Sequence, residues 1–215
     1  MLVFLDRQHA GKIHRLADRG AFGDLDGDGT ADGDGAREIE AMLTPVYMLH
    51  AEKRLIELGH SVVWLCDGTY KARAKRAQSY TPRGDLAAYI ACHINCLGAE
   101  GGSVTANSGR YGAAFYDSRS KAGHGDRLAQ AIKFELEMSC PELSEVKALP
   151  CSRSKWARAF TTIRHVGRPV AACFEPGFLD QDAHRDLWLP SGLQRIGEAL
   201  AEGIDNWAHN LEGST

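Results

Sequence analysis

The chain has 215 residues, of which 44% are hydrophobic and 25% charged, a composition typical of a globular protein that folds in water. Its formal net charge of -3 argues against a broad nucleic-acid-binding surface. No apolar run is long enough for a transmembrane helix, and the first residues lack the basic segment and cleavage site of a signal peptide. We therefore expect a single domain over residues 1–215 that acts as a monomer, without nucleic-acid or membrane partners.

The first apolar segment is followed closely by a histidine. Residues 2–5 predict a short β-strand, and His9 lies in the polar stretch after it. A single histidine in such a position is more often structural than functional. A second histidine after another strand would change this interpretation, because metal sites are built from imidazoles that converge from separate strand ends.

Residues 24–35 form an acidic, glycine-rich segment with the sequence DLDGDGTADGDG. Its alternating aspartates and the glycine after them match the first half of an EF-hand calcium loop: Asp24, Asp26, Asp28 and Gly29. The twelfth position is Gly35, where the calcium loop requires a bidentate glutamate. Two interpretations remain: a weak Ca²⁺ site, or a solvated surface loop inserted at about residues 22–36.

The first predicted helix follows this loop. Thr44 and Pro45 are a plausible N-cap and first-turn pair, apolar residues recur at helical spacing after them, and Gly59 is a natural C-terminal stop. Glu38 and Glu40 then lie at or just before the helix entrance. There they either complement the helix dipole or turn inward as a metal ligand.

The most apolar strand of the chain ends on a second histidine. Residues 86–92 contain no glycine or proline and are long enough for a strand that is buried on both faces, and His93 follows at once. The carboxyl ends of buried parallel strands form the ligand-binding crevice of open α/β sheets, so His93 is well placed for chemistry.

The remaining segments alternate between strands and helices. The expected strands are residues 60–67, 112–116, 160–163 and 169–174, and the expected helices are residues 70–77, 126–138 and 193–211. The last strand ends on Glu175. This alternation predicts an α/β fold: a single three-layer domain with a mostly parallel central sheet flanked by helices.

Two histidines and two glutamates therefore lie at strand ends or at a helix entrance. Two imidazoles and one carboxylate are a common catalytic zinc set, which leaves a fourth position for water. His9, His93 and either Glu38 or Glu40 would hold the ion, and Glu175 would exchange a proton with the water. Spacing alone does not establish this site, because the residues are far apart in the sequence.

The order and local context of these residues resemble the zinc-dependent N-acetylmuramoyl-L-alanine amidases of the type 3 family. These enzymes cut the bond between muramic acid and L-alanine in peptidoglycan. The resemblance spans nearly the whole chain, from residue 2 to about residue 182, and four segments carry it. Residues 6–11 are similar to the family's Asp-x-Gly-His-Gly motif, and residues 73–78 to an arginine followed by Ala-Asn. Residues 85–95 are similar to Asp, an apolar strand and Ser-x-His-x-Asn, and residues 169–178 to Pro, an apolar strand, Glu, a spacer, Gly and Phe. Gln8 and Ala10 replace the two glycines that flank the family's first ligand.

The resemblance implies a role for each matched residue. The family's second ligand lies about nineteen residues before the glycine that ends the helix, and counting back from Gly59 favours Glu40 over Glu38. His9, Glu40 and His93 would then bind one Zn²⁺ per chain, and Glu175 would be the catalytic base. The partner implied is bacterial peptidoglycan.

The resemblance also suggests an origin, and it leaves alternatives. A catalytic domain without a signal peptide or wall-binding module looks like a phage endolysin, made in the host cytoplasm and released to the cell wall at lysis. A zinc peptidase that acts within the stem peptide, or a non-catalytic wall-binding module on the same fold, remains possible from the sequence. The reaction products distinguish these three functions.

Overall fold

The computed structural model of the chain describes residues 1–9, 20–26, 29–31, 39–98, 102–103, 111–119, 123–151 and 160–212. Its central element is a six-stranded sheet with the strand order β3-β1-β4-β8-β6-β7. The strands are β1 (Leu2–Arg7), β3 (Ser61–Leu65), β4 (Ala87–Cys92), β6 (Tyr111–Tyr116), β7 (Glu145–Pro150) and β8 (Val170–Glu175). A separate small sheet pairs β2 (Thr30–Ala31) with β5 (Gly102–Ser103).

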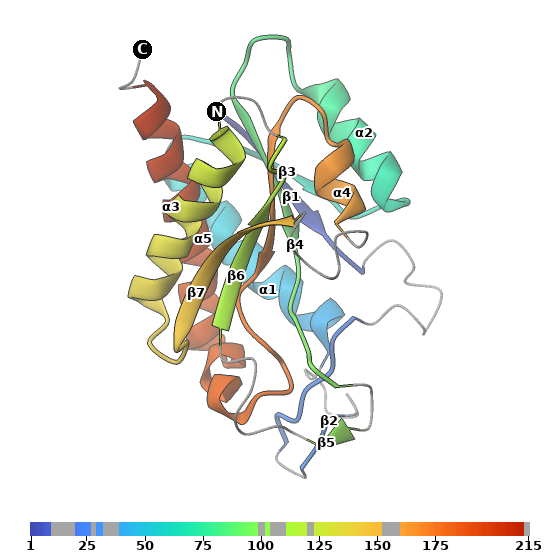
Figure 1. Cartoon of the computed structure of the whole chain (residues 1–215), viewed down its shortest axis with the longest axis vertical. Helices are drawn as coiled ribbons and strands as arrows, with labels where there is room; N and C mark the ends of the chain where they lie inside the picture. Colours follow the sequence, from blue (N-terminus) through green and yellow to red (C-terminus); the bar gives the residue numbers. More distant parts are fainter. Residues whose placement is uncertain are drawn as a thin grey trace.

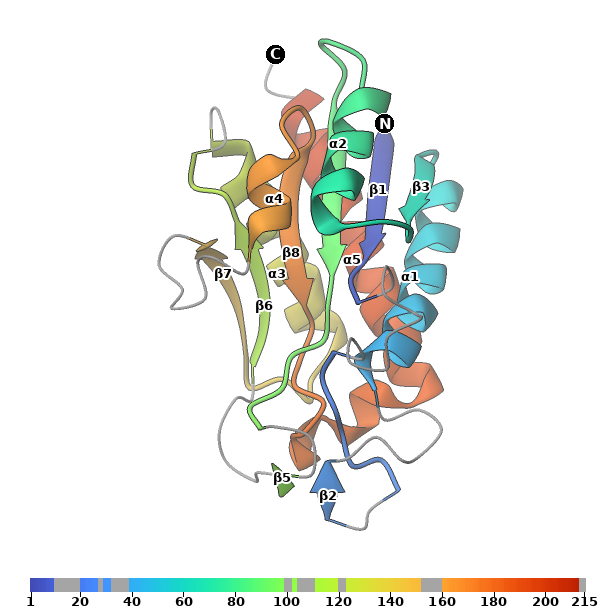
Figure 2. The ribbon, with the colours of Figure 1, turned by 90° about the vertical axis from the view of Figure 1, so that its right-hand side faces the viewer.

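The direction of the strands sets where their ends lie. Strands β3, β1, β4 and β8 run parallel to one another, whereas β6 is antiparallel to β8 and parallel to β7. The carboxyl ends of β1, β4 and β8 therefore lie side by side at one end of the sheet, and the chain termini lie at the other end (Figure 2). The mostly parallel sheet expected from the sequence is confirmed.

Helices cover both faces of this sheet and make the domain three-layered (Figure 1). One face packs against α1 (Glu40–Glu57), α3 (His124–Ser139) and α5 (Pro190–Glu212), and the other against α2 (Tyr70–Tyr80) and α4 (Thr161–His165); a 3₁₀ helix, η3 (Asp182–Trp188), precedes α5. All residues of β4 are buried, as its unbroken apolar sequence requires. In the described ranges we find no helix that is both long and apolar enough to cross a membrane.

Helix α1 begins earlier than the sequence suggests. It starts at Glu40, so that Pro45 lies inside the helix and not in its first turn. Proline has no N–H to offer the carbonyl four residues before it. The Arg7 side chain compensates, because its Nη2 donates to the Ala41 carbonyl oxygen at 2.5 Å. The predicted end is confirmed: Gly59 has a left-handed φ of 85° directly after the helix.

Two other predictions differ from the structure. Residues 160–163, expected as a strand, begin the short helix α4. Strand β7 was not expected, because only Val146 of its six residues is fully buried and the segment shows little apolar alternation. Both segments lie at the periphery, where contacts with neighbouring elements outweigh the weak local preference of a short sequence.

Candidate metal centre and active site

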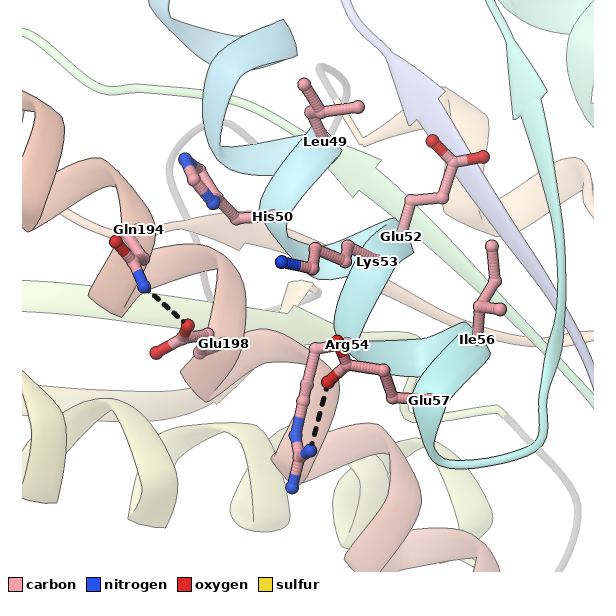
Figure 3. Close-up of a pocket in the computed structure, with 9 residues that line it drawn as sticks. All are labelled: Leu49, His50, Glu52, Lys53, Arg54, Ile56, Glu57, Gln194 and Glu198. Atoms are coloured by element: carbon pink, nitrogen blue, oxygen red, sulfur yellow. Dashed lines mark hydrogen bonds and ion pairs between the residues drawn. The ribbon is translucent and has the colours of Figure 1, made fainter.

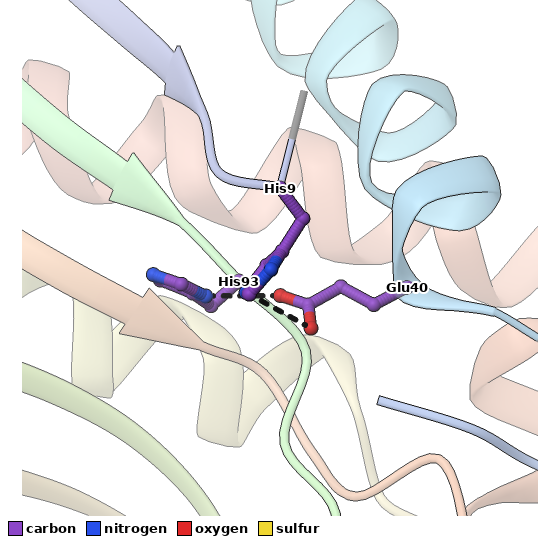
Figure 4. Close-up of side chains that lie close together, drawn as sticks. All are labelled: His9, Glu40 and His93. Carbon is purple, nitrogen blue, oxygen red and sulfur yellow. Dashed lines mark hydrogen bonds and ion pairs between the residues drawn. The ribbon is translucent and has the colours of Figure 1, made fainter. Parts of the chain in front are cut away.

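The predicted site residues gather at the carboxyl end of the sheet. His9 follows β1 by two residues, His93 comes directly after β4, and Glu40 is the first residue of α1 (Figure 4). The β1–β4 pairing runs from Leu2 to Arg7, which brings the two histidines to neighbouring strand ends. Among the described residues, these three form the one group of histidine, cysteine or acidic side chains whose donor atoms cluster within 4.8 Å.

The three side chains approach one another through Glu40. His93 Nδ1 lies 2.9 Å from Glu40 Oε1, and His9 Nε2 lies 3.6 Å from Glu40 Oε2. The two imidazole rings meet edge to face, with centroids 5.2 Å apart. The glutamate side chain is only 3% exposed, whereas those of His9 and His93 are 21% and 23% exposed. Glu40 therefore forms the buried side of the cluster, and solvent reaches the cluster from the side of the two histidines.

Backbone groups fix the Glu40 carboxylate. The Ala21 N–H donates to Oε2 at 2.8 Å, and the Ile94 N–H donates to Oε1 at 2.9 Å. Burial opposes ionisation of Glu40, but the hydrogen bond and charge of His93, with smaller contributions from His9 and Ile94, outweigh it and lower its pKa. Glu40 thus carries its negative charge at a fixed position, as a metal ligand must.

This donor set suits Zn²⁺. Two imidazole nitrogens and a carboxylate oxygen are ligands of catalytic zinc sites, and bonds of about 2.0 Å in tetrahedral geometry place neighbouring donors roughly 3.3 Å apart. The separations of 2.9 and 3.6 Å reach different oxygens of Glu40, and one donor atom from each of the three residues lies within 4.8 Å of the other two. His9, Glu40 and His93 could therefore hold the ion once these atoms draw together, with an open position toward solvent.

Glu175 is the last residue of β8, the strand that pairs with β4 on the side away from β1. Asn95 Nδ2 donates to Glu175 Oε2 at 2.8 Å, and the Cys173 thiol lies 3.9 Å from Oε1. Burial raises the pKa of Glu175 to about 7, although the charge of His93 opposes this effect. A carboxyl group with a pKa near neutrality can both accept and return a proton under physiological conditions.

A buried ion pair supports the segment that carries His9. Arg73 Nε of α2 lies 2.7 Å from Asp6 Oδ1 near the end of β1, and neither side chain is exposed. The Tyr89 hydroxyl of β4 donates to Asp6 Oδ2. Burial raises the pKa of Asp6 to about 6, with Arg73 acting in the opposite direction. Three residues further along, His9 adopts a left-handed φ of 59°, which is uncommon for a residue other than glycine.

We expect Arg73→Met to destabilise the fold by about 3–5 kcal/mol, because it leaves Asp6 as an uncompensated buried charge. The free energy of unfolding from urea titration measures this effect. Arg54→Met is the matched control, since the Arg54 side chain is 38% exposed and its ion pairs with Glu202 and Glu57 lie at the surface, where solvent screens them and they contribute little to stability. A second substitution, Asp6→Asn, should recover part of the loss; equal costs for the Arg73 and Arg54 variants would contradict the role of the pair.

Gly20 also shapes the site, and the sequence alone did not reveal it. Its φ is +83°, and a Cβ at this position would overlap the Glu40 carboxylate. We expect Gly20→Ala to weaken Zn²⁺ binding by about 10–100-fold, because it displaces a ligand and its backbone support. Gly84→Ala is the control: Gly84 has a φ of +94° but nothing within 4 Å of the new Cβ. Competition with a chromophoric chelator measures the affinity, and an equal effect of both substitutions would contradict the steric argument.

The other sequence predictions lie partly outside the described residues. Glu38, the alternative ligand, and Asp28 of the acidic loop both belong to this undescribed part. Asp24 accepts a hydrogen bond from the Gly29 N–H at 2.9 Å, and Asp26 is exposed. Calcium binding by the loop stays a prediction. The Tyr47 hydroxyl, which donates to the His93 carbonyl oxygen at 3.0 Å, is a further support that sequence reasoning missed.

No protein-family model matches the sequence, and no curated protein sequence matches it either. Solved structures do match. The N-acetylmuramyl-L-alanine amidase Ami1 from Mycobacterium smegmatis superposes with a TM-score of 0.68 at 21% identity, over 98% of this chain and 97% of that chain. The fold is that of the N-acetylmuramoyl-L-alanine amidases.

Two further structures share this amidase fold. The catalytic domain of the CD27L endolysin, which targets Clostridia difficile, matches with a TM-score of 0.61 at 16% identity, over 95% of this chain and 96% of that chain. Cwp6 from Clostridium difficile matches with a TM-score of 0.68 at 18% identity over 96% of this chain. The chain spans only 29% of the length of Cwp6. The fold that the motif resemblance implied is thereby confirmed.

Proposed function

We propose that the chain is a zinc-dependent peptidoglycan hydrolase that cleaves the amide bond between N-acetylmuramic acid and the L-alanine of the stem peptide. The observation that carries this proposal is the convergence of His9, Glu40 and His93 at adjacent strand ends, with Glu175 on the next strand of an amidase fold. Zinc ligands without a neighbouring proton carrier would suit a structural site; this arrangement suits hydrolysis.

Each residue has a defined task in the proposed reaction. Zn²⁺ held by His9, Glu40 and His93 would lower the pKa of a water molecule and polarise the scissile carbonyl. Glu175, whose pKa lies at about 7, takes a proton from the attacking water and gives it to the departing L-alanine nitrogen. Asn95 holds Glu175 Oε2 at 2.8 Å and so keeps the carboxylate oriented.

Mass spectrometry of purified peptidoglycan after digestion by the zinc-loaded protein tests this function. We expect free stem peptides with an L-alanine amino terminus. Fragments still joined to muramic acid would identify a peptidase, and wall binding without any product would identify a non-catalytic module. Either result would overturn the proposed activity.

We further propose that the protein acts in phage lysis, as an endolysin made inside the host and released to the cell wall. The support is its similarity to the catalytic domain of the CD27L endolysin over nearly the full length of both. Expression in a bacterium with susceptible peptidoglycan, followed by permeabilisation of the inner membrane, should cause rapid lysis. Intact cells after permeabilisation, despite active protein in the extract, would contradict this role.

A further inference from the structure

The strands beside Glu175 extend the candidate active site across the sheet. Strand β6 is antiparallel to β8, and β7 is parallel to β6, so the starts of β6 and β7 lie at the same end of the sheet as the carboxyl ends of β4 and β8 (Figure 2). In the strand register Glu175 is opposite Ala113, and Ala113 is opposite Lys147. Neighbouring strands lie about 4.8 Å apart, so the Cα atoms of Glu175 and Lys147 are roughly 10 Å apart in one cross-strand row.

The side chains of this row share one face of the sheet. Successive strand residues point to opposite faces, and Cys173, two residues before Glu175, packs with Ala113 on the face that α2 and α4 cover. Tyr111 also packs on this face, and Lys147 shares it as the direct cross-strand partner of Ala113. Glu175, Tyr111 and Lys147 are all partly exposed. A ligand in contact with Glu175 can therefore extend over this face toward β7.

The opposite face of the sheet carries a separate cavity. Its volume is about 650 Å³, and residues of α1 and α5 line it (Figure 3). Among them, Gln194 donates to Glu198 at 2.8 Å, and Arg54 contacts Glu57 at 3.2 Å. Both helices pack against the face that does not carry the Glu175 side chain. The cavity is therefore not a continuation of the candidate active site.

Aromatic contacts hold the Lys147 ammonium in place. Lys147 Nζ lies over the Tyr111 ring, 4.3 Å from its centre, and this ring packs edge to face on Phe178 with centroids 4.9 Å apart. Phe178 is only 2% exposed and forms a backbone bridge with Asn95, whose side chain donates to Glu175. A short series of contacts thus fixes the ammonium relative to the carboxylate that would transfer the proton.

The Tyr111 hydroxyl is influenced by the charges on both sides of it. Burial raises the pKa of Tyr111, the charge of Glu175 raises it further, and the charge of Lys147 opposes this rise. Both charged groups therefore act on the small area of surface that the Tyr111 ring forms. A ligand lying on this ring meets a proton carrier at one end and a positive charge at the other.

Lys147 already has one ionic partner, and the pair is exposed. Lys147 Nζ lies 3.1 Å from Glu145 Oε2, but the side chains are 33% and 58% exposed. Solvent screens such a pair, so it contributes little free energy. A carboxylate on a substrate that is anchored at the candidate metal centre can therefore replace Glu145 at low cost.

The order of groups along the row indicates which part of a substrate reaches Lys147. In the proposed reaction the scissile carbonyl lies at the candidate metal centre and the departing nitrogen lies at Glu175, so the peptide beyond that nitrogen continues toward β7. Two residues of extended chain span about 7 Å, and this brings the residue after L-alanine within reach of the long lysine side chain. The sugar lies on the other side of the scissile bond.

We propose that Lys147, held over the Tyr111 ring, selects substrates whose stem peptide carries a free carboxylate on the residue that follows L-alanine. This inference rests on the proposed amidase function and names the class of substrate for it. A contact between an ammonium group and a carboxylate is charge-assisted and roughly twice as strong as one between neutral groups. Stem peptides with a carboxamide at this position should therefore bind less tightly.

Calorimetric titration of the Zn²⁺-loaded protein with two product dipeptides tests the selection without any turnover. The first dipeptide joins L-alanine to the γ-carboxyl group of D-glutamate and keeps the α-carboxylate free; the second carries an α-carboxamide instead. We expect the wild type to bind the first about ten-fold more tightly, as one hydrogen bond to a charged group allows. Lys147→Met should bind both with the affinity that the wild type has for the carboxamide. Equal affinities in the wild type, or an unchanged preference in Lys147→Met, would overturn the proposal.

Two further variants separate recognition from a structural role. Lys133→Met is the matched control, because the Lys133 side chain is 31% exposed and pairs with Glu137 at 3.0 Å, but lies on α3 at the opposite face of the sheet. Glu145→Gln removes the ionic partner of Lys147 and leaves the ammonium in place. Both variants should keep the ten-fold preference. If Glu145→Gln or Lys133→Met loses the preference as Lys147→Met does, the ammonium is not the group that selects.

Hydrolysis of peptidoglycan separates this inference from the proposed function. Peptidoglycan whose stem peptides keep the free carboxylate is compared with peptidoglycan that carries the carboxamide. We expect the wild type to release the first kind of peptide with a lower KM and a similar kcat, because the contact is made before and during the reaction. Equal KM values would overturn the selection and leave the amidase activity standing. Release of neither peptide would overturn the amidase activity, and the calorimetric comparison would still decide the role of Lys147.

Discussion

Glu175→Gln is expected to lower amide hydrolysis by about 10²–10⁴-fold, since the glutamine amide cannot accept the proton that the reaction must transfer. The substitution keeps the side-chain shape and retains an oxygen that can accept the hydrogen bond from Asn95. Zinc content and thermal stability should therefore stay close to wild type. The yield of free stem peptides from purified peptidoglycan, quantified by mass spectrometry, measures the effect.

Glu57→Gln provides the control for this experiment. Glu57 is an exposed glutamate at the end of α1, beside the start of β3 and so at the opposite end of the sheet from the site, and its substitution should leave hydrolysis unchanged. Near-normal hydrolysis by the Glu175 variant would remove this residue from the mechanism. Loss of zinc in that variant would mean that Glu175 acts as a ligand.

His93→Ala should weaken zinc binding by more than about 100-fold, since loss of a direct ligand costs more than loss of a supporting residue. His93 also holds Glu40 Oε1 at 2.9 Å, so its removal weakens the placement of a second ligand. Metal content after equilibrium dialysis against zinc measures the loss. His165→Ala, at an exposed position of α4, should bind zinc normally. Full zinc occupancy in the His93 variant would exclude this residue from the site.

The central part of the fold could be predicted from the sequence because its signals are local. The unbroken apolar run that forms β4 and the stripe of α5 each identify their element without further information. Strand β7 and helix α4 carry no such signal, because their conformations depend on neighbours that the sequence does not reveal. The start of α1 was misplaced for a related reason: Pro45 is tolerated there only because Arg7, distant in sequence, bonds the freed carbonyl.

The convergence of the candidate metal ligands His9, Glu40 and His93 could be predicted for a different reason. Parallel strands bring their carboxyl ends together, so histidines that follow two strands were expected to converge. The contacts that hold these side chains in position could not be predicted in this way. Gly20 and Ala21 reach Glu40 through an irregular segment, and the bond from Asn95 to Glu175 depends on side-chain orientation. Such contacts require the three-dimensional arrangement of loops.

The pairing of β4 with β8 has a consequence for the order in which activity can arise. The His93 N–H donates to the Phe174 carbonyl oxygen at 2.9 Å. The backbone position of His93, a candidate ligand, therefore depends on a strand that lies 81 residues later in the sequence. During synthesis β8 leaves the ribosome after almost all other strands and helices. A nascent or proteolysed chain that ends before β8 lacks both this bond and Glu175. Hydrolytic activity is therefore expected to appear only when synthesis is nearly complete.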